Sequence, residues 1–354
     1  MHPKHPVKGR GTPDNPANRF HATRRERGVD AAACASECVA PATELIKDAS
    51  RSIISWNQSP DVPFDRSINP YRGCEHGCVY CFARPSHAYL DCSPGLDFET
   101  RIFYKPEAPR LLEKELAKPG YRCQPIALGV NTDAYQPAER KLGITRGLLE
   151  VLQAHRHPVG IVTKSALVER DTDILAGMAA DGLAHVMVSV TTFDGELARR
   201  LEPRAAAPHR RLETVRRLAA SGIPVGVLVA PVIPFLNDAE IEAILERARE
   251  AGAAQAGYVM LRLPREVKDL FRDWLARHEP LKAQRILHRI EDTRGGRLND
   301  PRFGSRMRGE GVYAELIAQR FRKACAVLAF PGLPAFDCTR FAPPAVDCAQ
   351  YTLF

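Results

Sequence analysis

Three cysteines close together in the chain, Cys74, Cys78 and Cys81, carry the strongest chemical signal in this sequence. Their spacing is C-x3-C-x2-C, and Gly73 and Gly77 beside them favour a tight loop. Iron–sulfur clusters are held by cysteine thiolates, usually four of them. Three thiolates can therefore hold three irons of a 4Fe-4S cluster and leave the fourth iron open to a small molecule.

A structural zinc ion is the main alternative for this loop, because zinc also binds thiolates but takes four ligands. His76 or Cys92 could supply the fourth ligand. The ten cysteines of this 354-residue chain are too sparse for the disulfide framework of a small secreted domain. Cys34 and Cys38 repeat the C-x3-C spacing, but they lie in an Ala-rich segment without further ligands.

The segment Asn69–Phe82 and several later segments resemble the radical S-adenosylmethionine (SAM) superfamily. Within it, they are most similar to the spore photoproduct lyase-related branch, also called DNA repair photolyase-like. The resemblance runs from Asn69 to Leu261. It implies that Cys74, Cys78 and Cys81 bind the cluster and that the open iron binds SAM. It also implies cleavage of SAM to a 5′-deoxyadenosyl radical, which removes a hydrogen atom from a substrate.

The same resemblance implies four SAM-binding residues. Tyr80 lies inside the cysteine motif and matches the aromatic residue that packs near SAM. Thr132, Lys164 and Ser189 follow predicted strands, where the relatives place SAM contacts. A lysine there can pair with the SAM carboxylate through a charge-assisted hydrogen bond. Each residue has an alternative role. Tyr80 would pack in the core, and Thr132 would belong to an Asx turn. Lys164 would be solvated, and Ser189 would belong to a turn that ends its strand.

Two positions depart from the lyase pattern. Lyases keep a hydrogen-donating cysteine two residues before the hydroxyl that Thr132 matches, and this chain has Val130 there. The residue after the third cluster cysteine is Phe82 instead of tyrosine. Cys92 is the candidate for a replacement thiol donor, with a buried bystander as the alternative. The segment Glu202–Arg204 is also shared with the lyases, and we assign it only loosely to SAM or substrate.

A repeated alternation of strand and helix patterns must position these residues. The predicted strands are Ser67–Tyr71, Ile126–Val130, Val159–Thr163, Ala184–Val190, Val225–Ala230 and Gly257–Leu261. The predicted helices between them are Leu142–Ala154, Asp171–Ala180, His209–Ala220 and Asp238–Ala251. This pattern is typical of an α/β fold with a parallel sheet. The resemblance implies a partial (β/α)6 barrel of the radical SAM type, and a doubly wound sheet is the alternative. In either fold the carboxyl ends of the strands build the site.

The sequence divides into four predicted segments. Residues 1–66 form a basic, flexible N-terminal arm and a lead-in with a short strand, and residues 67–262 form the radical SAM core. Residues 263–328 form a helical C-terminal extension, and residues 329–354 an irregular tail. The predicted helices of the extension are Val267–Arg277, Leu281–Ile290 and Val312–Leu328.

The net charge of +8 is concentrated in two segments. Residues 1–30 hold seven basic and three acidic residues, and residues 297–323 hold the same numbers, so each segment has a net charge of +4. Local basic segments suit phosphate contacts, so they predict DNA as a partner. A solvated arm and an exposed helix are the alternative. Charge alone does not separate DNA from RNA.

The last five residues resemble the pentapeptide that binds the bacterial sliding clamp. Gln350, Leu353 and Phe354 match that pattern, and Thr352 stands in place of serine. Binding to a clamp would raise the local concentration of the enzyme near DNA. A tail that docks on its own domain is the alternative.

These observations predict a cytoplasmic radical SAM enzyme that repairs a DNA lesion and needs an electron-donor protein. No apolar run approaches the roughly 20 residues of a membrane span, and no hydrophobic signal core is present. The alternative functions are a radical SAM enzyme acting on RNA, a peptide or a small molecule, and a non-enzymatic iron–sulfur interaction module.

Overall fold

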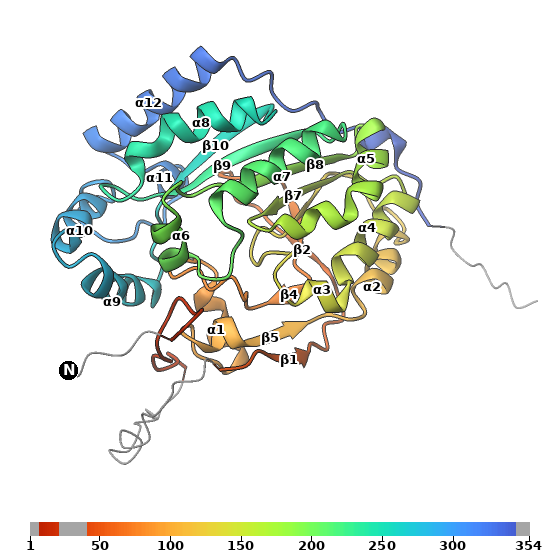
Figure 1. Ribbon diagram of the computed structural model, residues 1–354. Coiled ribbons are helices and arrows are strands. Elements are labelled where there is room, and N and C mark those ends of the chain that lie inside the picture. The colour runs from red at the N-terminus through yellow and green to blue at the C-terminus, as the bar shows by residue number, and fades with distance from the viewer. Residues whose placement is uncertain (1–6, 21–40, 345–354) are drawn as a thin grey trace, which may run out of the picture.

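The computed structural model describes residues 7–20 and 41–344, and its main element is a seven-stranded sheet (Figure 1). The strands of this sheet are β2 (Ile54–Trp56), β3 (Arg66–Ile68), β6 (Ile126–Leu128), β7 (Val159–Thr163), β8 (Ala184–Ser189), β9 (Val225–Val232) and β10 (Gln255–Met260). A second sheet has three strands, β1 (Glu44–Lys47), β4 (Tyr71–Arg72) and β5 (Arg101–Tyr104).

The order of the strands identifies the large sheet as an open barrel. From one edge to the other the order is β10-β9-β8-β7-β6-β3-β2. The six strands from β3 to β10 pair in parallel and follow one another in chain order, and β2 is antiparallel to β3. A doubly wound sheet reverses its strand order at a switch point, and this sheet does not. The fold is therefore the α/β partial (β/α)6 barrel, and the doubly wound alternative is wrong.

Helices cover the outside of the barrel (Figure 1). Those of the barrel and its lead-in are α1 (Asp97–Thr100), α2 (Ala108–Leu116), α3 (Glu139–Leu142), α4 (Ile144–Ala154), α5 (Thr172–Ala180), α6 (Gly195–Leu201), α7 (Pro208–Ala220) and α8 (Ile241–Glu250). Each longer helix turns one apolar face inward. Helix α8, for example, buries Ile241, Ile244, Leu245 and Ala248, the spacing of one helix face.

Strands β3, β6, β8 and β9 are buried on both faces, as expected for parallel strands between a filled barrel interior and a layer of helices. Val186 and Val188 on β8 and Val227 on β9 are fully buried, as are Leu148 and Leu149 on α4. These residues belong to one hydrophobic cluster that also includes Ile53 in the lead-in and Ile317 and Phe321 near the C-terminal end.

The first predicted barrel strand, Ser67–Tyr71, is wrong in its extent. The chain forms β3 at Arg66–Ile68, breaks at Asn69-Pro70, and then forms β4 at Tyr71–Arg72. Pro70 has no N–H to donate to a ladder, and β4 pairs with β5 of the other sheet. This break turns the chain away from the barrel just before the first cysteine of the motif.

The C-terminal extension contains helices α9 (Val267–His278), α10 (Ala283–Asp292), α11 (Ser305–Arg308) and α12 (Val312–Leu328). Apolar residues of α9 and α10 share a second hydrophobic cluster with Val79 and Tyr80 of the cysteine motif. Helix α12 packs on α8, where Arg320 and Glu242 form an ion pair at 2.5 Å.

Residues 329–344 run across the amino-terminal ends of the strands, and we call them the C-terminal strap. The backbone N–H groups of Gly332, Asp337 and Ala342 donate to the carbonyls of Ala254, Gly182 and His155, at 2.7, 3.1 and 2.9 Å. These three carbonyls lie just before β10, β8 and β7. The strap therefore lies at the pole of the barrel opposite the carboxyl ends of the strands.

Candidate radical SAM site

The cysteine motif forms a buried loop between β4 and a 3-10 helix at Arg84–Leu90. Cys74 and Cys78 are buried, and Cys81 is partly exposed. The Arg84 side chain fixes the loop, because its Nε donates to the Cys78 carbonyl at 2.9 Å and its Nη2 to the Gly77 carbonyl at 3.2 Å. Both Arg84 and its ion-pair partner Glu99, at 2.6 Å, are fully buried. This pair holds the backbone around the three thiols.

Two glycines in the loop cannot be replaced without strain. Gly73 and Gly77 have φ angles of 81° and 69°, which larger residues rarely adopt. A Cβ atom on Gly77 would lie 2.8 Å from Glu99 Oε2, and one on Gly73 would lie 2.9 Å from the Phe98 carbonyl oxygen. The glycines therefore allow the loop to pack directly on the elements behind it.

The donor set of the loop fits an iron–sulfur cluster better than a single ion. Burial raises the pKa of all three thiols, so a cationic partner is needed to hold them as thiolates. Within residues 7–20 and 41–344, no three His, Cys, Asp or Glu side chains converge on one ion position. In a cluster each thiolate binds its own iron, so the three sulfurs need not converge on one position.

The two candidate fourth ligands for zinc have other partners. The His76 Nδ1 lies 3.4 Å from Asp133 Oδ2. The sulfur of Cys92 lies 3.1 Å from Arg101 Nη1 and 3.3 Å from the Leu90 carbonyl oxygen. Cys92 is therefore engaged elsewhere, whereas the Nε2 atom of His76 has no partner among the described residues. Pairing of the other ring nitrogen with a carboxylate is common in zinc-binding histidines, so this contact does not decide between zinc and a cluster.

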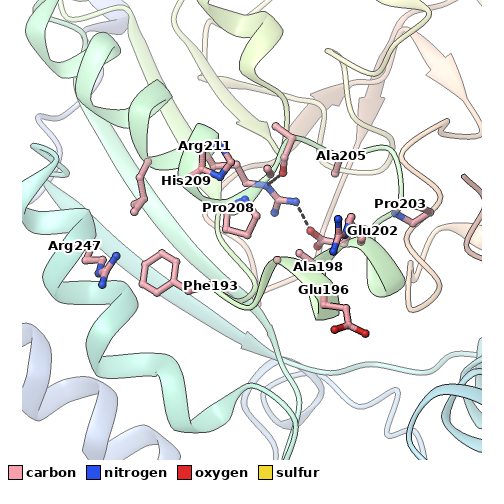
Figure 2. Close-up of a pocket in the computed structure, with 15 residues that line it drawn as sticks. Phe193, Glu196, Ala198, Glu202, Pro203, Ala205, Pro208, His209, Arg211 and Arg247 are labelled. Carbon is pink, nitrogen blue, oxygen red and sulfur yellow. Dashed lines mark hydrogen bonds and ion pairs between the residues drawn. The ribbon is translucent and has the colours of Figure 1, made fainter.

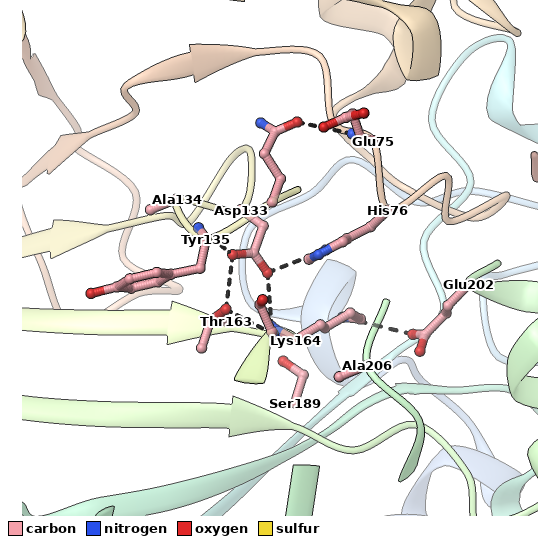
Figure 3. A network of polar contacts seen from close by, with 12 residues as sticks. Glu75, His76, Asp133, Ala134, Tyr135, Thr163, Lys164, Ser189, Glu202 and Ala206 are labelled. Carbon is pink, nitrogen blue, oxygen red and sulfur yellow. Dashed lines mark hydrogen bonds and ion pairs between the residues drawn. The ribbon is translucent and has the colours of Figure 1, made fainter. Parts of the chain in front are cut away.

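Asp133, which follows β6, connects the cysteine loop to the end of β7 (Figure 3). Its Oδ1 accepts hydrogen bonds from the Thr163 hydroxyl at 2.8 Å and the Tyr135 N–H at 2.9 Å. Its Oδ2 accepts from the Lys164 N–H at 2.7 Å and lies 3.4 Å from His76 Nδ1. Burial lowers the pKa of His76, and Asp133 partly opposes that effect. The sequence analysis did not single out Asp133, because an aspartate after a strand is common in turns.

Glu202 is the centre of a second buried network at the ends of β7 and β8. Its carboxylate accepts hydrogen bonds from the Tyr80 hydroxyl and from the Thr191 hydroxyl, the latter at 2.7 Å, and pairs with Arg211. Burial alone would raise the pKa of Glu202, but the Arg211 and Lys164 cations lower it to about 2. The carboxylate is therefore charged at neutral pH. Its segment, Glu202–Arg204, had only a loose assignment from the sequence.

The segment around Glu202 also packs on the cysteine loop itself. The N–H of Arg204 donates to the His76 carbonyl at 3.2 Å, and the N–H of Val79 donates to the Leu201 carbonyl at 3.1 Å. The N–H of Ala206 donates to the Lys164 carbonyl at 3.4 Å. Backbone hydrogen bonds thus join the loop, the end of α6 and the end of β7 into one site.

The structure brings Tyr80, Lys164 and Ser189 together around Glu202 and Arg211. The Lys164 Nζ lies 3.9 Å from Glu202 Oε1 and 6.0 Å from the centre of the Tyr80 ring. The Ser189 carbonyl accepts a hydrogen bond from Arg211 at 3.0 Å, and its side chain lies beside Lys164 (Figure 3). Among the described residues, neither the Lys164 ammonium nor the Ser189 hydroxyl donates a hydrogen bond. Both groups can therefore bind a ligand.

The structure gives Thr132 and Cys92 different surroundings. The Thr132 hydroxyl is buried and donates to the Tyr71 carbonyl at 2.7 Å, so its proton already holds β4 in place. Cys92 is buried against Arg101 and Leu90, and its described contacts include none of the three strand-end residues. Phe82 is 44% exposed, with the Arg262 guanidinium 5.1 Å from its ring centre.

Several predicted residues lie outside the part of the chain that the structure describes. These are Cys34, Cys38 and the clamp-like residues Gln350, Leu353 and Phe354. The clamp and the electron donor therefore stay predicted partners. Within residues 7–20 and 41–344, no helix is long and apolar enough to cross a membrane.

Comparison with known proteins assigns the family. Residues 68–248, about half of the chain, match the radical SAM superfamily. The chain belongs to this superfamily, whose members use a 4Fe-4S cluster and SAM. An uncharacterised protein of Mycobacterium bovis is 38% identical over 221 residues, which cover 62% of this chain and 65% of that protein. An uncharacterised protein of Methanocaldococcus jannaschii is 27% identical over 197 residues, which cover 56% of this chain and 71% of that protein. The match thus spans less than two thirds of the mycobacterial relative.

Spore photoproduct lyase has a similar fold. Its structure with dinucleoside spore photoproduct superposes with a TM-score of 0.59 at 14% identity, covering 81% of this chain and 80% of the lyase. A mutant lyase with bound AdoMet and the same dinucleoside gives the same TM-score at 13% identity, covering 81% and 79%. At this level of identity the similarity concerns the fold.

Proposed function

We propose that this protein is a radical SAM enzyme that removes a hydrogen atom from a DNA lesion. The observation that carries the proposal is the placement of Lys164 and Ser189, both with free donors, beside the cysteine loop at the carboxyl ends of β7 and β8. The fold it shares with a lyase that binds a dinucleoside photoproduct supports DNA as the substrate class.

Each group of residues has a separate task in this proposal. Cys74, Cys78 and Cys81 hold the cluster, in a loop that Arg84 fixes from behind. When bound, the cluster and SAM together supply the radical that abstracts the hydrogen atom. The Tyr80 side chain and the surrounding apolar residues exclude water from this loop, since Tyr80 is buried and belongs to the hydrophobic cluster of α9 and α10.

Lys164 is the residue best placed to bind the SAM carboxylate. Its ammonium lies 3.9 Å from Glu202, which is beyond hydrogen-bond distance, so its three N–H donors stay available. Glu202 is already paired with Arg211 and does not compete strongly for Lys164. Thr132 is less suited than the sequence suggested, because its hydroxyl proton is used by the Tyr71 carbonyl.

Replacing Lys164 with alanine is expected to weaken SAM binding while the cluster stays intact. A hydrogen bond to a charged group contributes about 1.5–3 kcal/mol, so the Kd for SAM should rise about 10- to 100-fold. Equilibrium binding of radiolabelled SAM to the reconstituted protein measures this. Lys118→Ala, which removes an exposed lysine beyond α2, is the control. Equal affinities in both variants would mean that Lys164 does not contact SAM.

The reaction differs from that of the lyases at its hydrogen donor. Val130, in place of the lyase cysteine, has no thiol that could donate a hydrogen atom, and the Cys92 sulfur contacts Arg101 and the Leu90 carbonyl. This difference supports a related lesion or a related chemistry in preference to the strict spore photoproduct reaction.

The test is anaerobic formation of 5′-deoxyadenosine. The reconstituted protein, SAM and a strong reductant are incubated without DNA, with intact DNA and with ultraviolet-irradiated DNA, and the product is quantified by chromatography. We expect irradiated DNA to increase product formation over both other conditions. Equal product in all three would contradict the DNA substrate but keep the radical SAM enzyme, and RNA, peptides and small molecules would then be tested in the same way.

A further inference from the structure

Several basic residues of the two segments that the sequence assigned to DNA pair with carboxylates in the folded chain. In residues 297–323, Arg302 pairs with Asp300 at 3.0 Å, and Arg306 pairs with Asp61. Arg320 of the same segment pairs with Glu242. In residues 7–20, Arg19 pairs with Glu266 at 2.8 Å. These pairs lower the positive charge that the two segments offer to an external anion, although Arg297, Arg308, Arg322 and Lys323 form no ion pair among the described residues.

Unpaired cations gather in a pocket of about 410 Å³ between α6, α7 and α8 (Figure 2). Arg199, His209 and Arg247 line it, and within the described residues none of the three forms an ion pair. The Arg247 guanidinium lies 5.0 Å from the centre of the Phe193 ring, which holds it at the pocket wall.

Two carboxylates also line this pocket, and they do not cancel its charge. Glu202 is fully engaged with the buried Arg211 at the pocket wall. Glu196 is exposed on α6. The open guanidinium groups of Arg199 and Arg247 against one open carboxylate give the pocket a positive balance, with His209 counted as neutral.

A second pocket of about 160 Å³ lies on the other side of Arg199. It is lined by Arg10, Arg199, Arg200, Arg277 and His278, and no acidic side chain lines it. The Nε atom of Arg200 is buried and has no hydrogen-bond partner in the described chain. Burial lowers the pKa of Arg277, and burial together with Arg204 lowers that of Arg10. Arg200 pairs with Glu279 at 3.1 Å, whereas Arg10, Arg199 and Arg277 form no ion pair among the described residues, so an anion bound here would be stabilised.

We propose that the two pockets form one cationic track that binds the phosphate backbone of DNA, with Arg199 as the contact they share. The two pockets adjoin at Arg199 and Pro203, which line both, and their cations come from α6, α8, α9 and the N-terminal segment, a longer array than one small anion would contact. A DNA strand carries a charge about every 3.4 Å of its axis and can occupy both. The inference rests on the DNA substrate proposed above.

The track adjoins the cofactor site. Glu202 and Ala206 line the first pocket, and the same residues contact Lys164, through the 3.9 Å ion pair and the backbone hydrogen bond to its carbonyl. A strand lying in the track would therefore pass beside the residues that we assign to SAM. Phosphate contacts of this kind position a strand without reading its sequence, as a lesion-directed enzyme requires.

The test is binding of a fluorescently labelled 20-base-pair DNA duplex to the cluster-loaded protein, followed by fluorescence anisotropy from 50 to 200 mM salt. Arg199→Ala and Arg247→Ala are the track variants. Arg322→Ala and Lys323→Ala are the matched controls, because both residues are exposed on α12 in the segment that the sequence favoured. We expect each track variant to bind about tenfold more weakly at low salt, with a slope of log K against log salt reduced by about 1. The controls should bind as the wild type does.

Other results would refute either the track itself, DNA as its ligand, or the proposed lesion substrate. Wild-type affinity in both track variants, or a loss confined to the α12 variants, would refute the track. Tenfold tighter binding of an RNA of the same sequence would refute DNA as its ligand. The 5′-deoxyadenosine assay separates this from the proposed function: product stimulated by DNA with normal binding in the track variants would refute only the track. Lost binding in those variants without stimulation by damaged DNA would refute only the lesion substrate. Thermal unfolding of each variant confirms that it is folded.

Discussion

Replacement of Cys78 by alanine is expected to abolish both the cluster and SAM cleavage. Cys78 is the central cysteine of the motif, and its carbonyl is fixed by Arg84 at 2.9 Å. Without its thiolate only two ligands remain on the loop, too few to hold a cluster whose irons each need a protein or substrate ligand. Iron content and the visible absorbance of the cluster should fall to background, and 5′-deoxyadenosine formation should fall at least about a hundredfold.

Cys325→Ala provides the matched control for this experiment. Cys325 is a partly buried cysteine on α12, and it packs against the main hydrophobic cluster far along the chain from the motif. The control should keep full iron content and full activity. Full iron content in the Cys78 variant would remove the assignment of the cluster, whereas loss of iron in both variants would show only that the fold is sensitive to lost cysteines.

The second large effect is a loss of stability expected from the substitution Glu202→Gln. Glu202 and Arg211 are both almost fully buried and pair with each other, so Glu202→Gln leaves the Arg211 cation without a counter-charge. Breaking a buried ion pair on one side costs about 3–5 kcal/mol. We therefore expect the free energy of unfolding of the metal-free protein, measured in urea at pH 7.5, to fall by about that amount. SAM binding should weaken as well, since Glu202 orders Tyr80 and Lys164.

Two further variants separate the buried pair from an ordinary surface pair. Glu213→Gln on α7 removes an exposed carboxylate that pairs with Arg216 and Arg217, and it should change stability by less than about 1 kcal/mol. The double variant Glu202→Gln/Arg211→Met removes both buried charges and should be more stable than Glu202→Gln alone. Equal losses at Glu202 and Glu213 would mean that burial does not strengthen the inner pair.

The parts of this protein that the sequence predicts are those with a local signal. The cysteine motif is contained within a few residues, and its glycines lie where the backbone needs them. The strands β6 to β10 have apolar runs of their own, and the alternation with helices fixes their parallel pairing. The same local signals placed Lys164 and Ser189 correctly at strand ends.

The parts that could not be predicted depend on partners distant in the chain. Arg306 pairs with Asp61 and Arg19 with Glu266, so counting charges along the sequence overestimated the free charge of both basic segments. Asp133 and Glu202 became centres of networks only because the barrel brings several strand ends together. The three-stranded sheet was missed because β1, β4 and β5 are short and draw on separated segments.

The order of the strands in the barrel has a consequence for synthesis on the ribosome. From β3 to β10, each strand pairs with the one made before it, and β2 is already present to cover the outer edge of β3. The sheet can therefore grow at one edge as the chain emerges, and no strand has to enter between two that are already paired. The C-terminal strap, which bridges the starts of β7, β8 and β10, is made after all of these strands. A ribosome that stalls before residue 329 would therefore hold a barrel that has all its strands but lacks the C-terminal strap across their amino-terminal ends.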